Sequence, residues 1–544
     1  MNDFRDMTIS TYVREHAESN PESVAIYYYD TSLTYGWLNR SADVLASYWL
    51  EKGVEQGDVI AAYMQNCPQF VVAYMAAQRL GAVLSPCNPM LKSKELTYQL
   101  GDLNAKAVIA AEELAEELEL AEKPSVRDIL LVSYRDLLDE QHQKNYSFDI
   151  PKSTADKLQS SYSVWAEIMQ HTGDTTDENG PTPVLIEPHI DTVKDASLII
   201  YTSGTTGQPK GAMLSFRNCT FKAQCAVATY SYSPDDRVSA AMPIFHVAGM
   251  LIGMTAPLVS GAAILLLTRF TPGDFVKVAI KHRMTFSYTT PPMNRAIIAT
   301  GRAHEIESLR LSIGTSFGSQ ITKALSDEWR SYTGQEYFEF AYGMSETHTA
   351  DSMNVPGKNR WGSTGLPTYE TSIWITDPDD RDKRLPVGEL GEISIASPAV
   401  FLGYKGKPEA TAKTMHNGRY YSGDMGRIDG DGYLFFDGRF KEMIKCNGYS
   451  VFPEEVEKYL QEHEAIHQAV AIGVPDETRG ESVKAFVVLN PEWQGKISEE
   501  EIVEWARETM AAYKYPRAVE FIKEVPQTAT GKMLRAKLRE QAEG

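Results

Sequence analysis

The chain of 544 residues has little cysteine, fewer basic than acidic residues and no long apolar run without interruption. Five cysteines are too few for a disulfide scaffold, and none falls in a Cys-x-x-Cys pair, so we expect reduced thiols in a cytoplasmic protein. Lys and Arg number 53 against 73 Asp and Glu, which gives a formal net charge of −20. Nucleic acids and anionic membranes require a basic surface, so this balance argues against both as general partners.

Two segments could be mistaken for membrane signals. The first ten residues carry Asp3, Arg5 and Asp6 and lack an apolar core, so we expect no signal peptide there. The stretch 247–268 holds 22 residues without a charge, but glycine and proline interrupt it. Residues 262–267 have the composition of a short buried strand. We therefore predict a buried helix followed by a strand, and no transmembrane segment.

The length and the apolar pattern predict two domains. Strands and helices alternate in the first hundred residues and again from Ala196, which is typical of parallel sheets with helices on both faces. Residues 112–192 are more acidic and polar and are predicted to be a surface excursion. Short strands and glycine turns dominate after residue 370. The expected domains are 1–437 and 438–544, the second a small α+β unit.

The strongest functional signal is the segment 201–211, Tyr-Thr-Ser-Gly-Thr-Thr-Gly-Gln-Pro-Lys-Gly, which follows a predicted strand. Its glycines let backbone N–H groups face one point, and its hydroxyls and Lys210 add further donors. Such a turn is suited to a polyphosphate. It is not a Walker loop, because Lys210 is followed by Gly211 and not by Ser or Thr. A flexible linker would not explain Pro209 and Lys210 directly after an apolar strand.

Four further segments carry groups that could serve a nucleotide. Segment 341–347 offers an aromatic ring for a base and Glu346 for a hard cation such as Mg²⁺, and segment 421–424 ends in a carboxylate that can accept from ribose hydroxyls. Segment 437–449 has three cations and two glycines, which suits a hinge near an anion. Segment 526–535 presents Lys532 just before a C-terminal helix. Each alone could be a helix cap, a turn or a solvated lysine.

Taken together and in this order, the five segments resemble the adenylate-forming superfamily of acyl-CoA synthetases, luciferases and peptide-synthetase adenylation domains. The resemblance runs from Leu33 to Arg535. It implies an α/β fold with a large N-terminal domain of two α/β lobes plus a β-barrel-like subdomain, and a small mobile α+β C-terminal lid domain. It also implies a two-step reaction. A carboxylate attacks the α-phosphate of ATP to give acyl-AMP and pyrophosphate, and a thiol then displaces AMP.

The resemblance also assigns residues. Those expected to bind ATP and AMP are Thr202, Ser203, Gly204, Thr205, Thr206, Gly207, Lys210, Tyr342, Asp424 and Arg439. Ser345 is expected at the α-phosphate, Glu346 on Mg²⁺, and Lys532 between carboxylate and phosphate. Lys441 is the expected hinge residue, and Lys445 and Gly448 belong to the lid face used in the thioester step with CoA. Mg²⁺ and a lysine would neutralise two anions that must approach each other.

The chain departs from the usual pattern of the superfamily at three places. Ser345 and Ser422 stand where threonine is commoner, and both keep the hydroxyl. Segment 313–318, Ile-Gly-Thr-Ser-Phe-Gly, stands where Ser-Gly-Gly-Ala-Pro is usual. We expect a backbone contact with adenine from this segment without assigning it to single residues. The excursion at 112–192 is longer than is typical.

Two histidine motifs have competing interpretations. His463-Glu-Ala-Ile-His467 matches the zinc-protease string, but zinc would need both histidines on one helix face and a third ligand. A strand predicted after helix 453–464 places His467 at the helix end or beyond it, so we expect a structural role. His246, which follows Phe245, is either a buried core histidine or, by the resemblance, lies beside the acyl carboxylate.

The substrate is predicted from a few positions. Amino-acid-activating members carry Asp where His246 stands, so an acid without an α-amine is favoured. Only 12 residues follow Lys532, so we expect CoA rather than a fused carrier domain as the thiol. Met250, Leu251, Ile252, Met254 and segment 288–293 are expected to form an apolar acyl pocket.

The prediction for the substrate is a medium- or long-chain fatty acid, with ATP, Mg²⁺ and CoA as the other small molecules. An aryl acid of the cinnamate or benzoate kind is an alternative within the same activity. A second alternative is an enzyme that transfers the acyl group to a carrier protein. A third is a binding module without catalysis, but the intact Lys532, Glu346 and Lys210 argue against it. A homodimer is compatible with the sequence.

Overall fold

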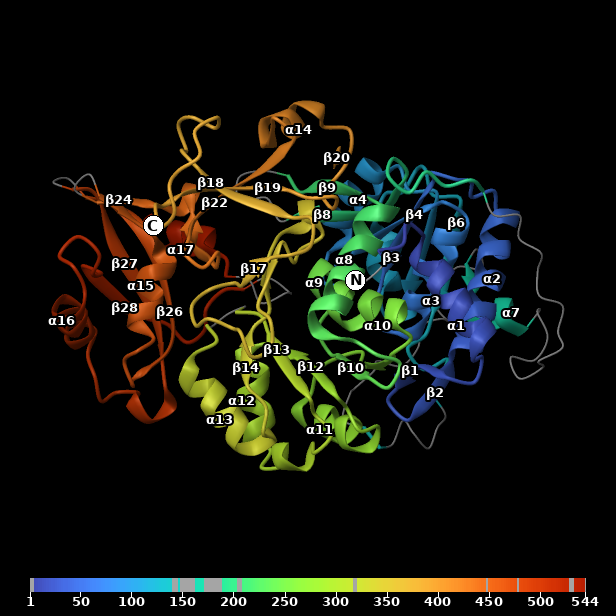
Figure 1. Ribbon diagram of the computed structural model, residues 1–544, viewed down its shortest axis with the longest axis horizontal. Coiled ribbons are helices and arrows are strands. Elements are labelled where there is room, and N and C mark those ends of the chain that lie inside the picture. The colour runs from blue at the N-terminus through green and yellow to red at the C-terminus, as the bar shows by residue number, and fades with distance from the viewer. Residues whose placement is uncertain are drawn as a thin grey trace.

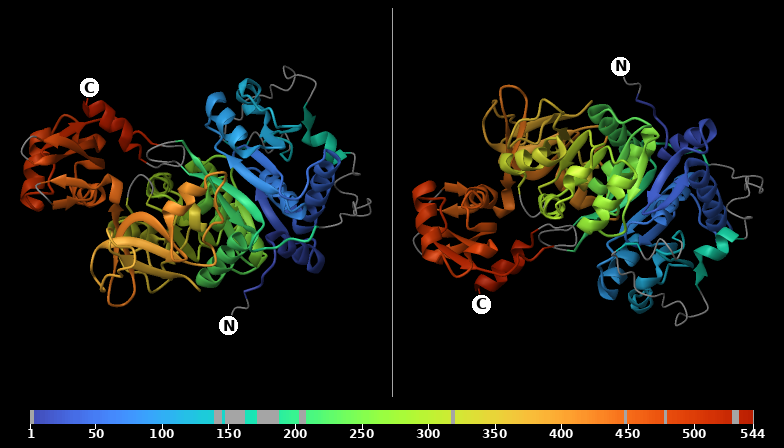
Figure 2. Two further views of the ribbon diagram at one scale, coloured as in Figure 1. Left: turned by 90° about the horizontal axis from the view of Figure 1, so that it is seen from above. Right: turned by 90° about the horizontal axis from the view of Figure 1, so that it is seen from below.

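The computed structural model describes residues 4–138, 145–146, 162–170, 188–202, 208–316, 320–446, 449–476, 479–527 and 533–543. In this part of the chain two large sheets and a smaller antiparallel sheet precede a separate C-terminal sheet. Figure 1 shows the C-terminal unit, in red, at one end of the long axis and the large sheets toward the other end. The views from above and below show the same arrangement (Figure 2). The predicted α/β fold with a large and a small part is confirmed.

The first large sheet has eight strands. In spatial order they are β20 (Gly403–Tyr404), β9 (Lys210–Ser215), β8 (Ala196–Thr202), β4 (Val83–Cys87), β3 (Val59–Tyr63), β5 (Ala107–Ala111), β6 (Asp128–Val132) and β7 (Ser163–Val164). The β8–β9 and β9–β20 pairs are antiparallel, and the pairs from β8 to β7 are parallel. β3, β4 and β5 are buried at every position, as expected for strands covered on both faces.

The second large sheet has seven strands. In spatial order they are β14 (Tyr337–Glu339), β13 (Leu311–Gly314), β12 (Phe286–Thr289), β10 (Arg237–Ala240), β11 (Ala263–Leu266), β1 (Val24–Tyr28) and β2 (Thr31–Thr34). Adjacent strands are parallel, except for β1 and β2, which form an antiparallel hairpin. Parallel strands end at the same edge of a sheet, which is where α/β proteins bind ligands.

Helices cover the faces of these two sheets. They include α1 (Ile9–Ser19), α2 (Tyr35–Glu51), α3 (Pro68–Arg79), α4 (Ser93–Leu103), α5 (Ala115–Leu120), α7 (Trp165–Gln170), α8 (Phe216–Tyr230), α11 (Pro272–Lys281), α12 (Pro291–Ala299) and α13 (Lys323–Thr333). α2 begins where the Thr34 hydroxyl accepts the Trp37 N–H at 3.1 Å, a side-chain cap that satisfies one free donor of the first turn. α2 and α3 lie between β2, β3 and β4 in sequence, so the alternation of strands and helices predicted for the first hundred residues is confirmed.

The prediction of a surface excursion over 112–192 is wrong for residues 128–132. These form β6, which lies between β5 and β7 inside the first sheet, with Leu130, Leu131 and Val132 buried. The segment Asp-Ile-Leu-Leu-Val is apolar enough for a buried strand, and the polar sequence around it concealed this signal. Residues 139–144, 147–161 and 171–187 lie outside the described part of the chain.

The charge-free stretch 247–268 is buried, as predicted. It consists of α9 (Val247–Met250), one wider turn η3 (Leu251–Thr255), α10 (Ala256–Ser260) and strand β11. In the described part of the chain, no helix is both long and apolar enough to cross a bilayer. All five cysteines are buried and unpaired.

The β-rich part predicted after residue 370 is confirmed. Its main sheet is antiparallel and consists of β18 (Ser372–Thr376), β19 (Gly391–Ala396), β22 (Arg419–Ile428), β21 (Met415–His416) and β23 (Leu434–Arg439), which pairs with β22. A small sheet of β15 (Ala341–Tyr342), β16 (Ser352–Met353) and β17 (Leu366–Pro367) lies between this part and the second large sheet in sequence. α14 (Pro408–Thr414) follows β20, the edge strand that this region contributes to the first sheet.

The C-terminal unit has its own sheet and its own buried cluster of apolar residues. Its strands are β25 (Tyr449–Val451), β24 (Ile444–Cys446), β27 (Gly480–Leu489), β26 (Ile466–Asp476) and β28 (Ala518–Phe521), and its helices are α15 (Pro453–Leu460), α16 (Glu499–Thr509) and α17 (Arg535–Glu543). The short helix η6 (Phe440–Glu442) connects β23 to β24. We call residues 438–544 the small domain, as in the domain prediction.

Candidate active site

A cavity of about 2250 Å³ lies where the large sheets, the antiparallel part and the small domain meet. Its wall includes Thr202 at the end of β8 and Glu339 at the end of β14, so it opens at the carboxyl edge of both large sheets. Arg439 and Arg535 line it from the side of the small domain. This is the position expected for a ligand in an α/β protein.

The base of the predicted phosphate loop is a β-hairpin. Thr202 of β8 pairs with Lys210 of β9, so the chain turns back between them. Both arms are attached to α4: the Tyr201 hydroxyl donates to Asp102 Oδ2 at 2.6 Å, and the Tyr98 hydroxyl donates to the Pro209 carbonyl at 2.8 Å. The loop residues Ser203, Gly204, Thr205, Thr206 and Gly207 themselves lie outside the described residues.

Glu346 and Lys210 both contact Tyr404, and all three residues line the cavity. The Tyr404 hydroxyl donates to Glu346 Oε1 at 2.6 Å, and Lys210 Nζ lies 4.3 Å from the centre of the Tyr404 ring. Glu346 is on the short helix η5 (Ser345–Thr347), whose first residue, Ser345, also lines the cavity. One aromatic residue of β20 therefore contacts both a carboxylate and a cation of the cavity wall.

The antiparallel sheet contributes a second cluster of polar side chains to the cavity wall. Asp424 of β22 lies opposite Arg439 of β23, and Arg439 Nε is 3.1 Å from Asp424 Oδ1. The Tyr342 hydroxyl donates to Asp424 Oδ2 at 2.8 Å, and the Tyr342 ring stacks on Phe436. All of these residues line the cavity. The three predicted nucleotide-binding residues Tyr342, Asp424 and Arg439 are thus brought into direct contact.

The turn from Gly343 to Asp351 joins these two groups. Its ends are paired in the hairpin of β15 and β16, and the Asp351 N–H donates to the Tyr342 carbonyl at 2.7 Å. His348, Thr349 and Ala350 have φ angles of +55°, +58° and +52°. Left-handed backbone at a non-glycine residue costs roughly 1–3 kcal/mol each, so this turn requires support from its surroundings.

Phe245 and His246 line the cavity just before α9, where His246 Nδ1 accepts the Ala248 N–H at 3.4 Å. The backbone here is tightly folded: a β-carbon on Gly249 would lie 2.1 Å from the Pro243 carbonyl oxygen. Glycine is therefore required at position 249, and the close contact fixes the loop that carries His246.

The other apolar residues expected in the acyl pocket are not in the cavity wall. Met250, Leu251, Ile252 and Met254 are completely buried in the main core, so that part of the prediction is wrong. Their charge-free sequence fits a core helix equally well, and periodicity does not distinguish the two. Among the described residues, the apolar part of the cavity wall includes Phe245, Val247, Ile321, Phe338, Phe340 and Met344.

A carboxyl group lies among these apolar residues. Glu339 Oε2 accepts the Ser316 N–H at 3.0 Å and the Ser316 hydroxyl at 2.5 Å. Burial raises the pKa of Glu339 to about 7, although both contacts with Ser316 lower it. Ser316 belongs to the segment 313–318 expected near adenine, of which 317 and 318 lie outside the described residues. The cavity wall therefore contains a group that titrates near neutral pH.

The small domain turns one face toward the cavity. Lys441, in η6, and Met533, Leu534 and Arg535 line it, whereas Lys445 of β24 is exposed and is not part of the wall. Lys532 and Gly448 lie outside the described residues. Arg535 contacts three carboxylates: its Nη1 is 2.5 Å from Glu442 and 3.0 Å from Glu454, and its Nη2 is 2.8 Å from Glu457. The segment directly after position 532 is thus attached to both η6 and α15.

The two histidines of the zinc-protease string do not share a helix. α15 ends at Leu460, so His463 follows it, and His467 lies in β26, as expected. The His463 ring packs edge-on against Trp505, with ring centres 4.9 Å apart. Among the described residues, no three His, Cys, Asp or Glu side chains form a metal-binding group.

Sequence reasoning missed several residues of the site. Tyr404, Asp102 and Tyr98 hold the phosphate-loop arms and Glu346, yet none belongs to a motif. Tyr404 is 58 residues from Glu346, and its position depends on a strand that crosses to another sheet. No local pattern could have indicated such a contact.

Two mostly parallel sheets, with a polar cavity at their carboxyl edges and a small separate domain beside it, are typical of two-domain α/β enzymes that bind a ligand at this edge. The family described as AMP-binding enzyme matches residues 13–405, and the AMP-binding enzyme C-terminal domain matches residues 455–532. The chain therefore belongs to the AMP-binding enzyme family, and it is an AMP-forming acyl-CoA synthetase.

Known proteins of this family resemble the chain over nearly its whole length. A long-chain-fatty-acid–CoA ligase of Bacillus subtilis (strain 168) is 33% identical over 538 residues, which covers 98% of this chain and 94% of the relative. A feruloyl-CoA synthase of an Amycolatopsis species is 30% identical over 541 residues, covering 98% and 99%. The solved structure of an anthranilate CoA ligase in complex with anthranoyl-AMP has a TM-score of 0.84 at 25% identity, covering 99% of this chain and 97% of that one.

Proposed function

We propose that the chain converts an apolar carboxylic acid and ATP to acyl-AMP and pyrophosphate, and then transfers the acyl group to CoA with release of AMP. The observation that carries this proposal is the single cavity wall shared by Lys210, Glu346 and the Tyr342–Asp424–Arg439 group. These are an anion-binding cation, a metal-type carboxylate and a diol-type acceptor. Together they match the three parts of Mg·ATP.

In the first step the acid must approach an anionic phosphate. Lys210 and the loop residues 203–207 bind the phosphates. Asp424, which is held by Arg439 and the Tyr342 hydroxyl, accepts hydrogen bonds from the ribose. Ser345 donates to the α-phosphate, and His246 lies beside the carboxylate. Preorganised donors of this kind orient two reactants and offset the repulsion between them.

The Glu346 carboxylate suits Mg²⁺, which is bound through one or two carboxylates together with substrate phosphates and water. Its second oxygen is not engaged in the Tyr404 contact, and Glu346 lines the same cavity as Lys210. Bound there, Mg²⁺ would neutralise phosphate charge. Glu346 would hold the ion, and Tyr404 would fix the orientation of the carboxylate.

For the second step we propose that the small domain rotates about Lys441. In the present orientation the segment that follows Lys532 lines the cavity and Lys445 does not. Lys532 would serve acyl-AMP formation in this orientation. A rotation would withdraw it and bring the face of Lys445 and Gly448 to the same site for CoA. The boundary between residues 437 and 438 is part of this proposal.

The proposed acid is a medium- or long-chain fatty acid, because the lining near His246 includes Phe245, Val247, Phe338 and Phe340. The similarity to a long-chain-fatty-acid–CoA ligase supports this choice. A hydroxylated aryl acid is the second candidate. Glu339 places a hydrogen-bond acceptor in the same wall, where it could meet a phenolic hydroxyl, and a feruloyl-CoA synthase is among the relatives.

The test is a panel of fatty, cinnamic and benzoic acids with ATP, Mg²⁺ and CoA, read as AMP and acyl-CoA. AMP formation that depends on one class of acid supports the proposal and selects the candidate. ADP as the stoichiometric product, or AMP formation without acyl-CoA, contradicts it. The second result, with transfer to an acyl-carrier protein, would instead support a carrier-loading ligase.

A further inference from the structure

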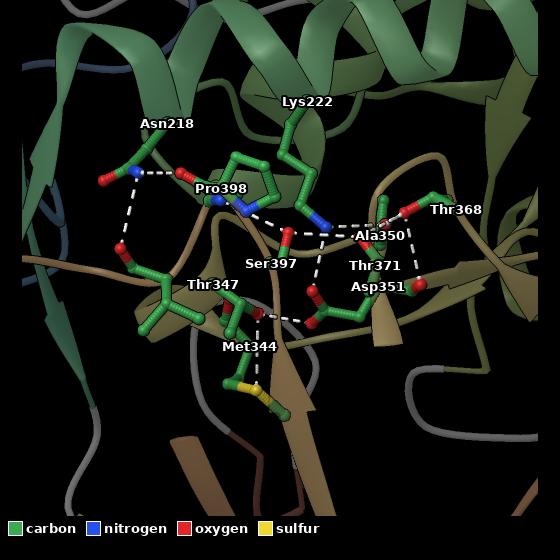
Figure 3. A network of polar contacts seen from close by, with 12 residues as sticks. Asn218, Lys222, Met344, Thr347, Ala350, Asp351, Thr368, Thr371, Ser397 and Pro398 are labelled. Atoms are coloured by element: carbon green, nitrogen blue, oxygen red, sulfur yellow. Dashed lines mark hydrogen bonds and ion pairs between the residues drawn. The ribbon is translucent and has the colours of Figure 1, made fainter. Parts of the chain in front are cut away.

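A buried ion pair lies directly behind the turn that carries Ser345 and Glu346. Lys222 of α8 and Asp351 have no exposed side-chain surface, and Lys222 Nζ is 2.8 Å from Asp351 Oδ1. Lys222 Nζ also donates to the Ala350 carbonyl at 2.9 Å. Figure 3 shows Lys222 reaching from the helix to the loop, with the Asp351 carboxylate pointing toward it. The pair therefore joins α8 to the far end of the turn.

The second oxygen of Asp351 connects to the beginning of the same turn. The Thr347 hydroxyl donates to Asp351 Oδ2, and Thr347 is the residue after Glu346 on η5. The backbone of Asp351 is held as well, because its carbonyl accepts the Thr368 N–H at 2.9 Å. One carboxylate thus accepts hydrogen bonds from α8 and from the short helix that presents Glu346 (Figure 3).

The backbone between these two attachments is left-handed at three successive residues, 348–350, none of them glycine. Such backbone persists only where the surroundings fix it. On one side the stretch packs on Gly343, where a β-carbon would lie 2.5 Å from the Ala350 nitrogen. On the other side, Lys222 binds the Ala350 carbonyl at the end of the stretch. The ion pair therefore acts where the turn needs support.

A buried ion pair is a poor source of stability. Removing two charges from water costs about as much as their attraction returns, and apolar residues of similar size stabilise a fold equally well. The Lys222–Asp351 pair does something that apolar residues would not do, because Asp351 accepts a hydrogen bond from the Thr347 hydroxyl and Lys222 donates one to the Ala350 carbonyl. Its specific contribution is the position of the turn.

We propose that Lys222 and Asp351 are positioning residues, which hold the 345–350 turn so that Glu346 and Ser345 are correctly placed for acyl-AMP formation. The inference rests on the proposed function. Neither residue is itself part of the cavity wall, so their effect is transmitted through the turn.

The test uses the full chain with Lys222 replaced by Met and Asp351 by Leu, so that no lone charge stays buried. Thr347→Val is a milder second variant, because it removes only the hydroxyl and keeps the ion pair. Arg79→Met with Asp43→Leu is the matched control, since it removes another buried ion pair, between α2 and α3, remote in sequence from the turn.

Three quantities are measured: the acid-dependent ATP–pyrophosphate exchange at varied Mg²⁺, the conversion of supplied acyl-AMP and CoA to thioester, and amide hydrogen exchange of residues 343–353 without ligand. A displacement of about 1 Å in a catalytic group can cost about 10²-fold in rate. We expect a loss of about 10²-fold in pyrophosphate exchange for the Lys222/Asp351 variant, with a higher Mg²⁺ requirement, and a smaller loss for Thr347→Val. The thioester step should change little, and residues 343–353 should exchange faster.

Either of two results overturns the inference. The first is full adenylation activity in the Lys222/Asp351 variant, with wild-type protection of 343–353. The second is a parallel loss of both half-reactions, equal to that of the Arg79/Asp43 control. If the wild-type chain forms no AMP with any acid, the proposed function fails, whereas the hydrogen exchange still tests whether the ion pair orders the turn. If the double variant does not fold, Thr347→Val decides by the same measurements.

Discussion

The turn around Glu346 and the lysine-bearing face of the small domain are built in opposite ways. Glu346 is attached to Tyr404, and the turn around it is fixed by a buried ion pair and a hairpin. By contrast, Lys441, in η6 between β23 and β24, and Lys445, in β24, are exposed side chains of the small domain. If the proposed function is correct, the groups that would bind the nucleotide are fixed by the fold in advance, and the groups that would serve only one step lie on exposed segments.

The largest expected effect separates the two lysines of the small domain. Lys532→Ala should lower acyl-AMP formation by about 10²–10³-fold, because one preorganised charge next to the developing bond is lost. It should still convert supplied acyl-AMP and CoA at a near-normal rate, and Lys445→Ala should show the reverse bias. Both half-reactions are measured separately by AMP and thioester formation.

Lys523→Ala is the matched control, because Lys523 is an exposed lysine of the small domain that is not part of the cavity wall. Equal loss of both half-reactions in Lys532→Ala would contradict a rotation of the small domain. Lys532 would then be a structural contact of the C-terminal helix.

The rigid half of the comparison is tested by Asp424→Asn. The amide keeps the shape but removes the charge that Arg439 and the ribose hydroxyls meet. Hydrogen bonds to charged groups contribute about 1.5–3 kcal/mol, so KM for ATP should rise about 10- to 100-fold. Asp377→Asn is a control directly after β18 of the same sheet, where Asp377 pairs with Lys383 and is not part of the cavity wall. An equal rise in KM for both variants would mean that the effect comes from the sheet and not from the ribose site.

A smaller effect is expected from pH at Glu339. Its pKa in the folded chain is raised to about 7, so the folded state binds a proton more readily than the unfolded state between about pH 4.5 and 7. The stability that wild type has relative to Glu339→Gln should therefore fall as pH rises through this window and level off above about pH 7. Thermal unfolding of both proteins from pH 5 to 8.5 measures it, and a constant difference contradicts the assignment.

The smallest effect is expected at His463. His463→Ala should leave turnover within a few-fold and should lower stability by about 0.5–1.5 kcal/mol, the size of one aromatic contact, here with Trp505. Purified protein should contain no stoichiometric zinc. Zinc at one per chain, with activity lost on its removal, would show that the string at 463–467 has a metal role.

Segments in which the candidate functional groups are close in sequence could be recognised from the sequence, and their function stays a prediction. Segments 341–347 and 421–424 come together with Arg439, because each motif sits on a strand or turn whose apolar pattern is clear. The apolar residues at 250–254 were misplaced, since a buried core helix and a pocket wall have the same composition. Contacts between distant segments, such as Tyr404 with Glu346 or Lys222 with Asp351, depend on tertiary packing and leave no local pattern.

The edge strand β20 has a consequence for the order in which the chain can fold during its synthesis. β9 is complete at residue 215, but the strand that pairs with its free side comes from residues 403–404. While the ribosome adds nearly two hundred residues, the backbone N–H and C=O groups on the outer edge of β9, in the β8–β9 hairpin, have no partner strand. Such an edge can pair wrongly with another chain. A nascent chain arrested shortly before residue 403 should therefore associate with itself more readily than one arrested after β22 and β23 of the main antiparallel sheet have emerged.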